Sequence, residues 1–264
     1  MFEHHKRALD NLVNHLRPDP SILAIITGGS VAQGKAKETS DVDVYLLIDD
    51  ESFSERKKTH NLTYINQDKN ICAYEGGYID GKFINRQFLE LAAKRGSEPT
   101  RASFIGSRTW FSRIPDLDAL LAKIPVYPEA NRERNIRDFF AQVFLYGFYF
   151  SDEAVKKNDS YLLAHTASNL VLFGGRIILA HNRILYPYHK WLLNAVENAP
   201  EKPDNFIEMA NDLLKQPTAT KCKSFAAMLL NFRDPGFAPE LSPALFLENS
   251  EWNWLDHEPP LSDR

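Results

Sequence analysis

Cysteine is scarce in this chain of 264 residues, because Cys72 and Cys222 are the only two. They lie far apart, and neither is flanked by residues at the spacing of a metal site. This scarcity excludes a disulfide framework and a zinc site built on cysteine. We expect both thiols to be reduced.

An excess of positive charge is also lacking. The chain has 31 Lys and Arg residues against 35 Asp and Glu residues, and its formal net charge is −4. Surfaces that coat nucleic acids usually carry a strong basic excess, so we expect no stable nucleic-acid partner. The negative charge permits cationic small substrates without demonstrating them.

Long apolar runs are absent as well. We see no run close to the roughly 20 residues that cross a bilayer, and the charged segment 1–7 has no apolar signal core. We therefore expect a cytoplasmic protein with no membrane partner. No repeat or low-complexity segment interrupts the chain, and its length and 44% apolar content suit two domains.

The first informative segment joins an apolar run to a glycine turn. Residues 22–26 (Ile-Leu-Ala-Ile-Ile) form a short, β-branched pattern that predicts a strand. The strand leads into Gly28, Gly29 and Ser30, where the backbone can turn sharply and approach a ligand. We expect Ser30 to cap a short helix that begins near Val31 and offers free N–H groups to a phosphate.

Two acidic residues mark the start of the next strand, 42–48. Asp41 and Asp43 stand two positions apart, so their side chains point to the same face of that strand. Two carboxylates held that close repel each other unless a divalent cation lies between them. Carboxylates together with substrate phosphates are the usual ligands of Mg²⁺. The pair therefore predicts a magnesium site.

These motifs in this order resemble the signature of the DNA polymerase β-like nucleotidyltransferases. The signature combines Gly-Gly-Ser at 28–30, Gly34 and Ser-Asp-Val-Asp at 40–43. Each motif alone is common in loops and strand edges, but their combination favours a functional site. The closest likeness is to the aminoglycoside-type antibiotic nucleotidyltransferases; it is strong over residues 20–50, moderate to residue 95 and only architectural beyond.

The resemblance implies roles for these residues. ATP would be the nucleotide donor, and Mg²⁺ the metal bound by Asp41 and Asp43. Gly28, Gly29 and Ser30 would bind the nucleotide phosphates, and Ser40 could add a further contact.

Members of this family also place a third carboxylate on a neighbouring strand, as general base, metal ligand or both. The segment 73–84 has strand-like apolar residues and acids at a suitable distance along the chain. We choose Asp80, because it follows apolar residues and precedes Gly81, which leaves room for a substrate. Asp-Gly is also a hairpin-turn signal, and a hairpin there would favour Glu75 instead.

The remaining N-terminal pattern predicts an α/β (α+β) domain. Leu9, Leu12, Val13 and Leu16 share one face of an opening helix. Further strands are expected at 62–66, 71–75 and 78–84, and helices at 87–94 and 117–124. We expect a small mixed sheet with helices on one side. The segment 126–128 predicts a boundary between a nucleotidyltransferase domain, 1–125, and a second domain, 126–264.

The second domain reads as an all-α helical bundle. Helices are expected at 131–157, 161–181, 187–197, 204–215 and 220–231, followed by an extended, proline-rich tail from Asp234. The aromatic-rich first helix should be buried on most sides. In antibiotic-modifying members of the family the acceptor lies between two such domains, so the resemblance implies that this bundle binds the acceptor.

The bundle contributes a few candidate site residues. His165, Asn169 and Arg176 form a polar stripe on one predicted helix, which would face either a cleft or a polar seam between helices. The stretch around Lys190 resembles a segment in which a lysine approaches the nucleotide phosphates. The alternative is a surface lysine beside a packed Trp191.

Together these features predict an enzyme that moves AMP from Mg-ATP to a hydroxyl of a small molecule and releases pyrophosphate. Asp80 would accept the proton of the hydroxyl. The acceptor could be an aminoglycoside-type antibiotic, although resistance activity is implied by the resemblance alone. The alternatives are AMP transfer to a protein or tRNA hydroxyl and an inactive nucleotide-binding module. We expect a monomer or a homodimer.

Overall fold

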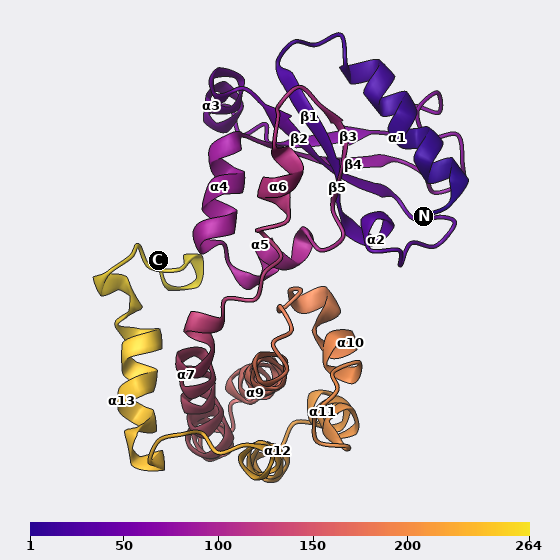
Figure 1. The fold of residues 1–264 in the computed structure, drawn as a ribbon. Helices are drawn as coiled ribbons and strands as arrows, with labels where there is room; N and C mark the ends of the chain where they lie inside the picture. Colours follow the sequence, from indigo (N-terminus) through magenta and orange to yellow (C-terminus); the bar gives the residue numbers. More distant parts are fainter. The chain divides into compact units, whose positions relative to one another are not determined.

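The computed structural model describes residues 1–264, which form two compact units. Unit 1 comprises Met1–Tyr127 and unit 2 comprises Pro128–Arg264. Figure 1 shows a sheet with helices in unit 1 and helices alone in unit 2. Each unit has its own hydrophobic core, and each is described by itself below.

Unit 1 is built on a five-stranded mixed sheet with the order β3-β4-β2-β1-β5. The strands are β1 (Ile22–Thr27), β2 (Val42–Ile48), β3 (Thr63–Asn66), β4 (Ile79–Ile84) and β5 (Arg108–Ser112). β2 and β4 are parallel, and the other neighbouring pairs are antiparallel. The α+β class, with a small mixed sheet followed by helices, is confirmed.

Helices cover both faces of this sheet, so the expectation of helices on one side was wrong. α1 (Glu3–Leu16) covers one face, and α4 (Arg86–Arg95), α5 (Glu98–Ser103) and α6 (Leu117–Leu121) cover the other. The reason is that the central strands are apolar on both faces. In β2, Val44 packs in the core with Leu12 of α1, whereas Leu47 packs in the core with Leu89 of α4.

Three local expectations in unit 1 also differ from the structure. Residues 71–75 form no strand, because Ile71 and Cys72 donate their backbone N–H groups to the carbonyl of Asp68 in a turn. β5, α3 (Asp50–Lys58) and α5 were not predicted. The short helix α2 (Gly29–Ala32) begins at Gly29, so Gly28 is its N-cap and Ser30 does not cap it.

Unit 2 is a helical bundle around α9 (Ser160–His181). Phe140, Leu170, Ile177, Phe206 and Phe225 are fully buried members of its core. The other helices are α7 (Arg132–Phe144), α8 (Ser151–Lys156), α10 (Leu192–Glu197), α11 (Phe206–Lys215), α12 (Ala219–Phe232) and α13 (Ser242–Phe246). The π-helix η2 (Leu145–Phe150) joins α7 to α8.

Two expectations for unit 2 were wrong. The aromatic-rich first helix is not buried on most sides, since Phe148 is 37% exposed and Tyr149 is 55% exposed. The tail is not extended, because after η4 (Pro239–Leu241) and α13 it continues in short helical turns. These turns are η5 (Leu247–Glu251), η6 (Asn253–Leu255) and η7 (Leu261–Asp263).

The helix α9 is long and apolar enough to cross a membrane by length and composition alone. The expectation that no such run exists was therefore wrong by this measure. Half of its apolar window is buried inside unit 2, where it forms the centre of the core. Its hydrophobicity is that of a core helix.

Candidate active site

Three aspartates meet where β2 and β4 begin. Asp43 and Asp80 are register partners across the parallel pair of strands, and Asp41 lies two residues before Asp43 on the same face. Carboxylate oxygens of all three lie within 4.8 Å of one another. The side chains are partly exposed, so an ion or a substrate can reach them.

The strand pattern explains why these acids point the same way. Further along the same face, β2 carries Tyr45 and Leu47, which pack under the helices on that side of the sheet. The opposite face carries Val42 and Val44, which pack in the core of α1. The carboxylates therefore lie at the end of a buried face, where the covering helices leave the strands accessible.

Tyr78 is a site residue that the sequence reasoning missed. Its hydroxyl donates a hydrogen bond to the Asp41 carboxylate, and this bond, together with the charges of Asp41, Asp80 and Asp43, raises the pKa of Tyr78 to about 12. The phenol therefore stays protonated at neutral pH and donates a hydrogen bond to Asp41. A signal was available, because Tyr78 stands two positions before Asp80 and so shares its side of the chain.

The glycine turn is in close contact with Asp43. Gly28 donates its backbone N–H to the carbonyl of Asp43 at 2.9 Å. Gly29 has a φ of +60°, and a Cβ at that position would lie 1.8 Å from Oδ2 of Asp43. Only glycine permits both this conformation and this approach. The hydroxyl of Ser30, which follows, makes no hydrogen bond within the chain and is partly exposed.

The loop before the aspartates is held by hydrogen bonds. The backbone N–H of Lys37 donates to Oγ of Ser40 at 2.9 Å, and the hydroxyl of Tyr74 donates to the Ser40 carbonyl at 2.9 Å. Nε2 of His4 lies 2.9 Å from the Glu38 carbonyl oxygen. Ser40 therefore shapes the loop that carries Asp41, and a phosphate contact from its hydroxyl stays a prediction.

Glu75 is placed apart from the carboxylate cluster. It is exposed in the turn between Tyr74 and Gly77, whose backbone N–H donates to the Tyr74 carbonyl. Asp80 and Gly81 lie inside β4, not at a hairpin tip. The structure thus brings Asp80, and not Glu75, to Asp41 and Asp43.

The candidates of unit 2 do not form one site. Asn169 donates to the backbone carbonyl of His165 at 2.9 Å, and its amide nitrogen lies 3.1 Å from Nε2 of the same residue. Arg176 instead lies between aromatic rings. Its guanidinium carbon is 4.6 Å from the ring centre of Phe139 and 4.4 Å from that of Tyr186. The three residues of the predicted polar stripe therefore do not share one environment, because His165 and Asn169 contact each other whereas Arg176 packs between aromatic rings.

Lys190 lies in η3 (His189–Trp191) of unit 2 and is exposed. Its Nζ is 5.7 Å from the ring centre of Trp191, which is itself 49% exposed. The predicted contact between Lys190 and the nucleotide phosphates stays a prediction.

A comparison with curated proteins gives no match. Among solved structures, the chain is similar to a nucleotidyltransferase-like protein from Exiguobacterium sibiricum 255-15, with 12% identity and a TM-score of 0.47 over 95% of this chain and 79% of that chain. Residues 9–75 match the family model of the nucleotidyltransferase domain, and this range contains the glycine turn, Asp41 and Asp43. Residues 9–75 of unit 1 are therefore similar to a nucleotidyltransferase domain, as the resemblance of the sequence to the DNA polymerase β-like superfamily predicts.

Proposed function

We propose that this protein transfers AMP from Mg-ATP to a hydroxyl group of a small molecule and releases pyrophosphate. One observation carries the proposal: oxygens of Asp41, Asp43 and Asp80 lie within 4.8 Å of one another. These oxygens lie beside the glycine turn at Gly28 and Gly29, in the unit whose residues 9–75 match a nucleotidyltransferase domain.

The donor set fits magnesium. Three carboxylates offer only hard oxygen ligands, and their mutual repulsion favours a divalent cation among them. Asp41, Asp43 and Asp80 would hold Mg²⁺, which when bound would supply charge neutralisation for the attacking and leaving oxygens.

The chain's own groups have distinct tasks in this proposal. The acceptor hydroxyl oxygen forms a bond to the α-phosphorus, and the bond from that phosphorus to the oxygen bridging to the β-phosphate breaks, so that pyrophosphate leaves. Asp80 accepts the proton of the hydroxyl. The Ser30 hydroxyl, which has no partner within the chain, binds the nucleotide phosphates. Gly29 supports this contact by keeping the turn close to Asp43.

The proposed acceptor is a small molecule, and the resemblance noted above suggests an aminoglycoside-type antibiotic. A formal charge of −4 is compatible with a cationic acceptor. Transfer to a protein or tRNA hydroxyl and nucleotide binding without turnover are the competing outcomes of the following test.

The test supplies each nucleoside triphosphate, labelled at the α-phosphate, with Mg²⁺. Acceptors are given as separate pools of aminoglycosides, lincosamides, nucleosides, tRNA and bacterial protein. We expect labelled AMP on a small molecule and an equal amount of pyrophosphate, both lost in EDTA. The Asp43→Asn variant serves as the blank. Label on tRNA alone or on protein alone would show that the acceptor is a macromolecule and not a small molecule. Nucleotide binding without transfer to any pool would contradict the proposal that the protein is an enzyme.

A further inference from the structure

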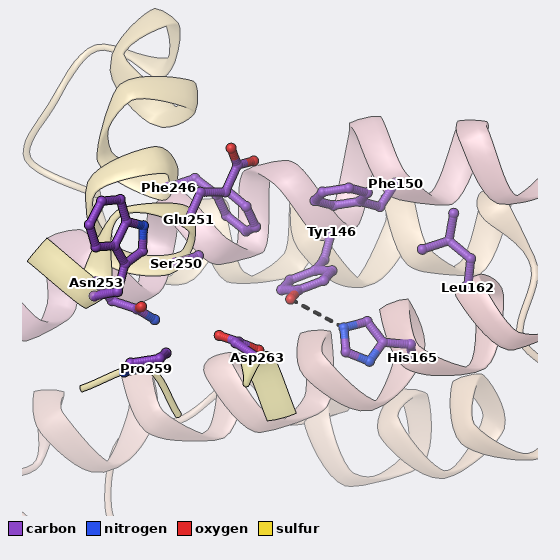
Figure 2. A pocket seen from close by; sticks show the side chains of 11 residues that line it. Tyr146, Phe150, Leu162, His165, Phe246, Ser250, Glu251, Asn253, Pro259 and Asp263 are labelled. Atoms are coloured by element: carbon purple, nitrogen blue, oxygen red, sulfur yellow. Dashed lines mark hydrogen bonds between the residues drawn. The ribbon is translucent and has the colours of Figure 1, made fainter. Parts of the chain in front are cut away.

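Unit 2 contains a cavity of about 610 Å³ that the proposed reaction does not use (Figure 2). It lies between the helices η2 and α9 on one side and the segment from α13 to η7 on the other. This volume is in the range of small-molecule binding sites, and the cavity is partly open to solvent.

Aromatic rings form one wall of this cavity. The ring centre of Tyr146 lies 5.4 Å from that of Phe150 and 5.9 Å from that of Phe246, and the two phenylalanines are 5.5 Å apart. Trp254 also lines the cavity and is 56% exposed. The electron-rich faces of such rings attract cations, and indole does so most strongly.

The charged groups of the lining are acidic. Asp263 and Glu251 line the cavity, and neither is in an ion pair, although Asp263 accepts a hydrogen bond from the hydroxyl of Ser262 at 2.9 Å. No Lys or Arg lines it, and the guanidinium of Arg264 is paired with Glu258. Figure 2 shows Asp263 across the hollow from Tyr146 and His165, whereas the carboxylate of Glu251 is turned away from Asp263 in this view.

The Nε2 atom of His165 is in contact with neighbouring polar groups of unit 2. The amide nitrogen of Asn169 lies within hydrogen-bond distance of both its Nε2 and its carbonyl oxygen, and the hydroxyl of Tyr146 lies 3.4 Å from Nε2. The cavity therefore combines aromatic faces and a carboxylate outside any ion pair with a lining that holds no Lys or Arg.

We propose that this cavity binds an organic cation, a protonated amine or quaternary ammonium group on an apolar body. The ammonium group would lie between Asp263 and the ring of Trp254, and the apolar part would contact Tyr146, Phe150 and Phe246. An anionic ligand would meet the carboxylate of Asp263 and no Lys or Arg side chain.

Calorimetry on the full-length protein without nucleotide tests this proposal, using benzyltrimethylammonium as the probe. Benzyl alcohol and benzenesulfonate are its neutral and anionic counterparts. We expect the cation to bind at least about tenfold more tightly than the alcohol, and we expect no binding of the sulfonate. Added salt should weaken binding of the cation, because salt screens the charge of an exposed carboxylate. Equal binding of the alcohol and the cation would overturn the proposal.

Variants locate the site. Asp263→Asn and Trp254→Leu should each weaken cation binding about fivefold, in line with the usual strength of such contacts. Glu251→Gln should weaken it less. Asp256→Asn is the matched control, an exposed acid of the same segment outside the lining, and should change the Kd by less than about twofold. If Asp263→Asn behaves like this control, the cation does not bind here. Because no nucleotide is used, the result is independent of the transferase activity.

Discussion

Asp80 lies directly beside Asp43, as its register partner across the parallel strands β2 and β4. Both carboxylates therefore project from hydrogen-bonded strands whose inner residues are buried, and not from flexible loops. Such a scaffold keeps their separation constant when a substrate binds. The consequence is that a small chemical change at either residue should alter chemistry without altering the fold.

For Asp80, we predict that Asp80→Asn lowers kcat by roughly 10²–10⁴-fold, the usual effect of removing a positioned proton acceptor. An amide cannot accept the proton, although it retains the shape of the side chain. If Asp80 acts mainly as the base, the Kd of Mg-ATP should stay within a few-fold of wild type. A steady-state rate and a nucleotide titration measure the two effects separately.

Glu75→Gln is the matched control for that substitution, because Glu75 is an exposed acid of the turn that precedes β4. We expect its kcat to equal that of the wild type. A silent Asp80→Asn beside an inactive Glu75→Gln would transfer the role to Glu75 and contradict our assignment.

Asp41 and Asp43 should couple nucleotide binding to magnesium. We predict that ATP raises the Tm of the wild type only when Mg²⁺ is present, since a ligand that binds the native state stabilises it by mass action. Asp41→Asn and Asp43→Asn should each abolish turnover and most of this shift, because amides are poor replacements for carboxylate ligands. Differential scanning fluorimetry with and without EDTA measures the shift.

Glu38→Gln controls for the loss of one negative charge on the same loop, since Glu38 is exposed and lies before Asp41. It should keep both the Tm shift and the activity. An ATP-dependent shift that survives EDTA in the wild type would favour a metal-free binding module.

Local sequence patterns were sufficient for part of this site. The alternation of a strand requires Asp41 and Asp43 to share a face, and the apolar residues of 42–48 locate that strand. The glycine turn was evident from the end of the preceding apolar run. Its contact with Asp43 was not, because the contact depends on how β1 pairs with β2.

Long-range pairing explains what the sequence left open. The choice between Asp80 and Glu75 depends on the register of β4 against β2, which no local pattern contains. The second helical layer follows from packing on both faces of β2, and α13 of the tail packs through Phe246 on aromatic side chains of η2. These contacts join residues that are distant in the chain.

The two cysteines give a prediction about pH. Burial raises the pKa of Cys222 to about 11 and also raises that of Cys72. Both thiols should therefore stay protonated at pH 8, so iodoacetamide should label them only after unfolding in urea. Mass spectrometry of native and unfolded protein checks this.

Because its pKa is raised, Cys222 also makes the free energy of unfolding depend on pH. The neutral thiol is favoured in the native state, so the stabilisation is fully present below pH 9 and is lost as the pH rises towards 11. The free energy of unfolding should fall over this window, and Cys222→Ala should reduce the slope. Rapid labelling of native protein at pH 8 would contradict the burial of these thiols.

Gly29 tests whether close approach to Asp43 matters for activity. A Cβ at Gly29 would lie 1.8 Å from Oδ2 and 2.4 Å from Cγ of Asp43, so Gly29→Ala must displace either the turn or the carboxylate. We predict a loss of turnover of at least about 10²-fold, because a displacement near 1 Å in a catalytic group has this effect. The rate of pyrophosphate release measures it.

Gly34→Ala separates this collision from the conformational cost alone. Gly34 has a φ of +73°, comparable with that of Gly29, but nothing lies within 4 Å of the position where its Cβ would be. Both alanine variants therefore incur the cost of a left-handed residue, about 1 kcal/mol in the free energy of unfolding. Only the new side chain of Gly29→Ala also collides with Asp43.

We expect Gly34→Ala to be slightly less stable than the wild type with near-normal turnover, and Gly29→Ala to be folded and inactive. Equal activity in the two variants would show that the turn can move away from Asp43 without consequence, and would remove Gly29 from the site.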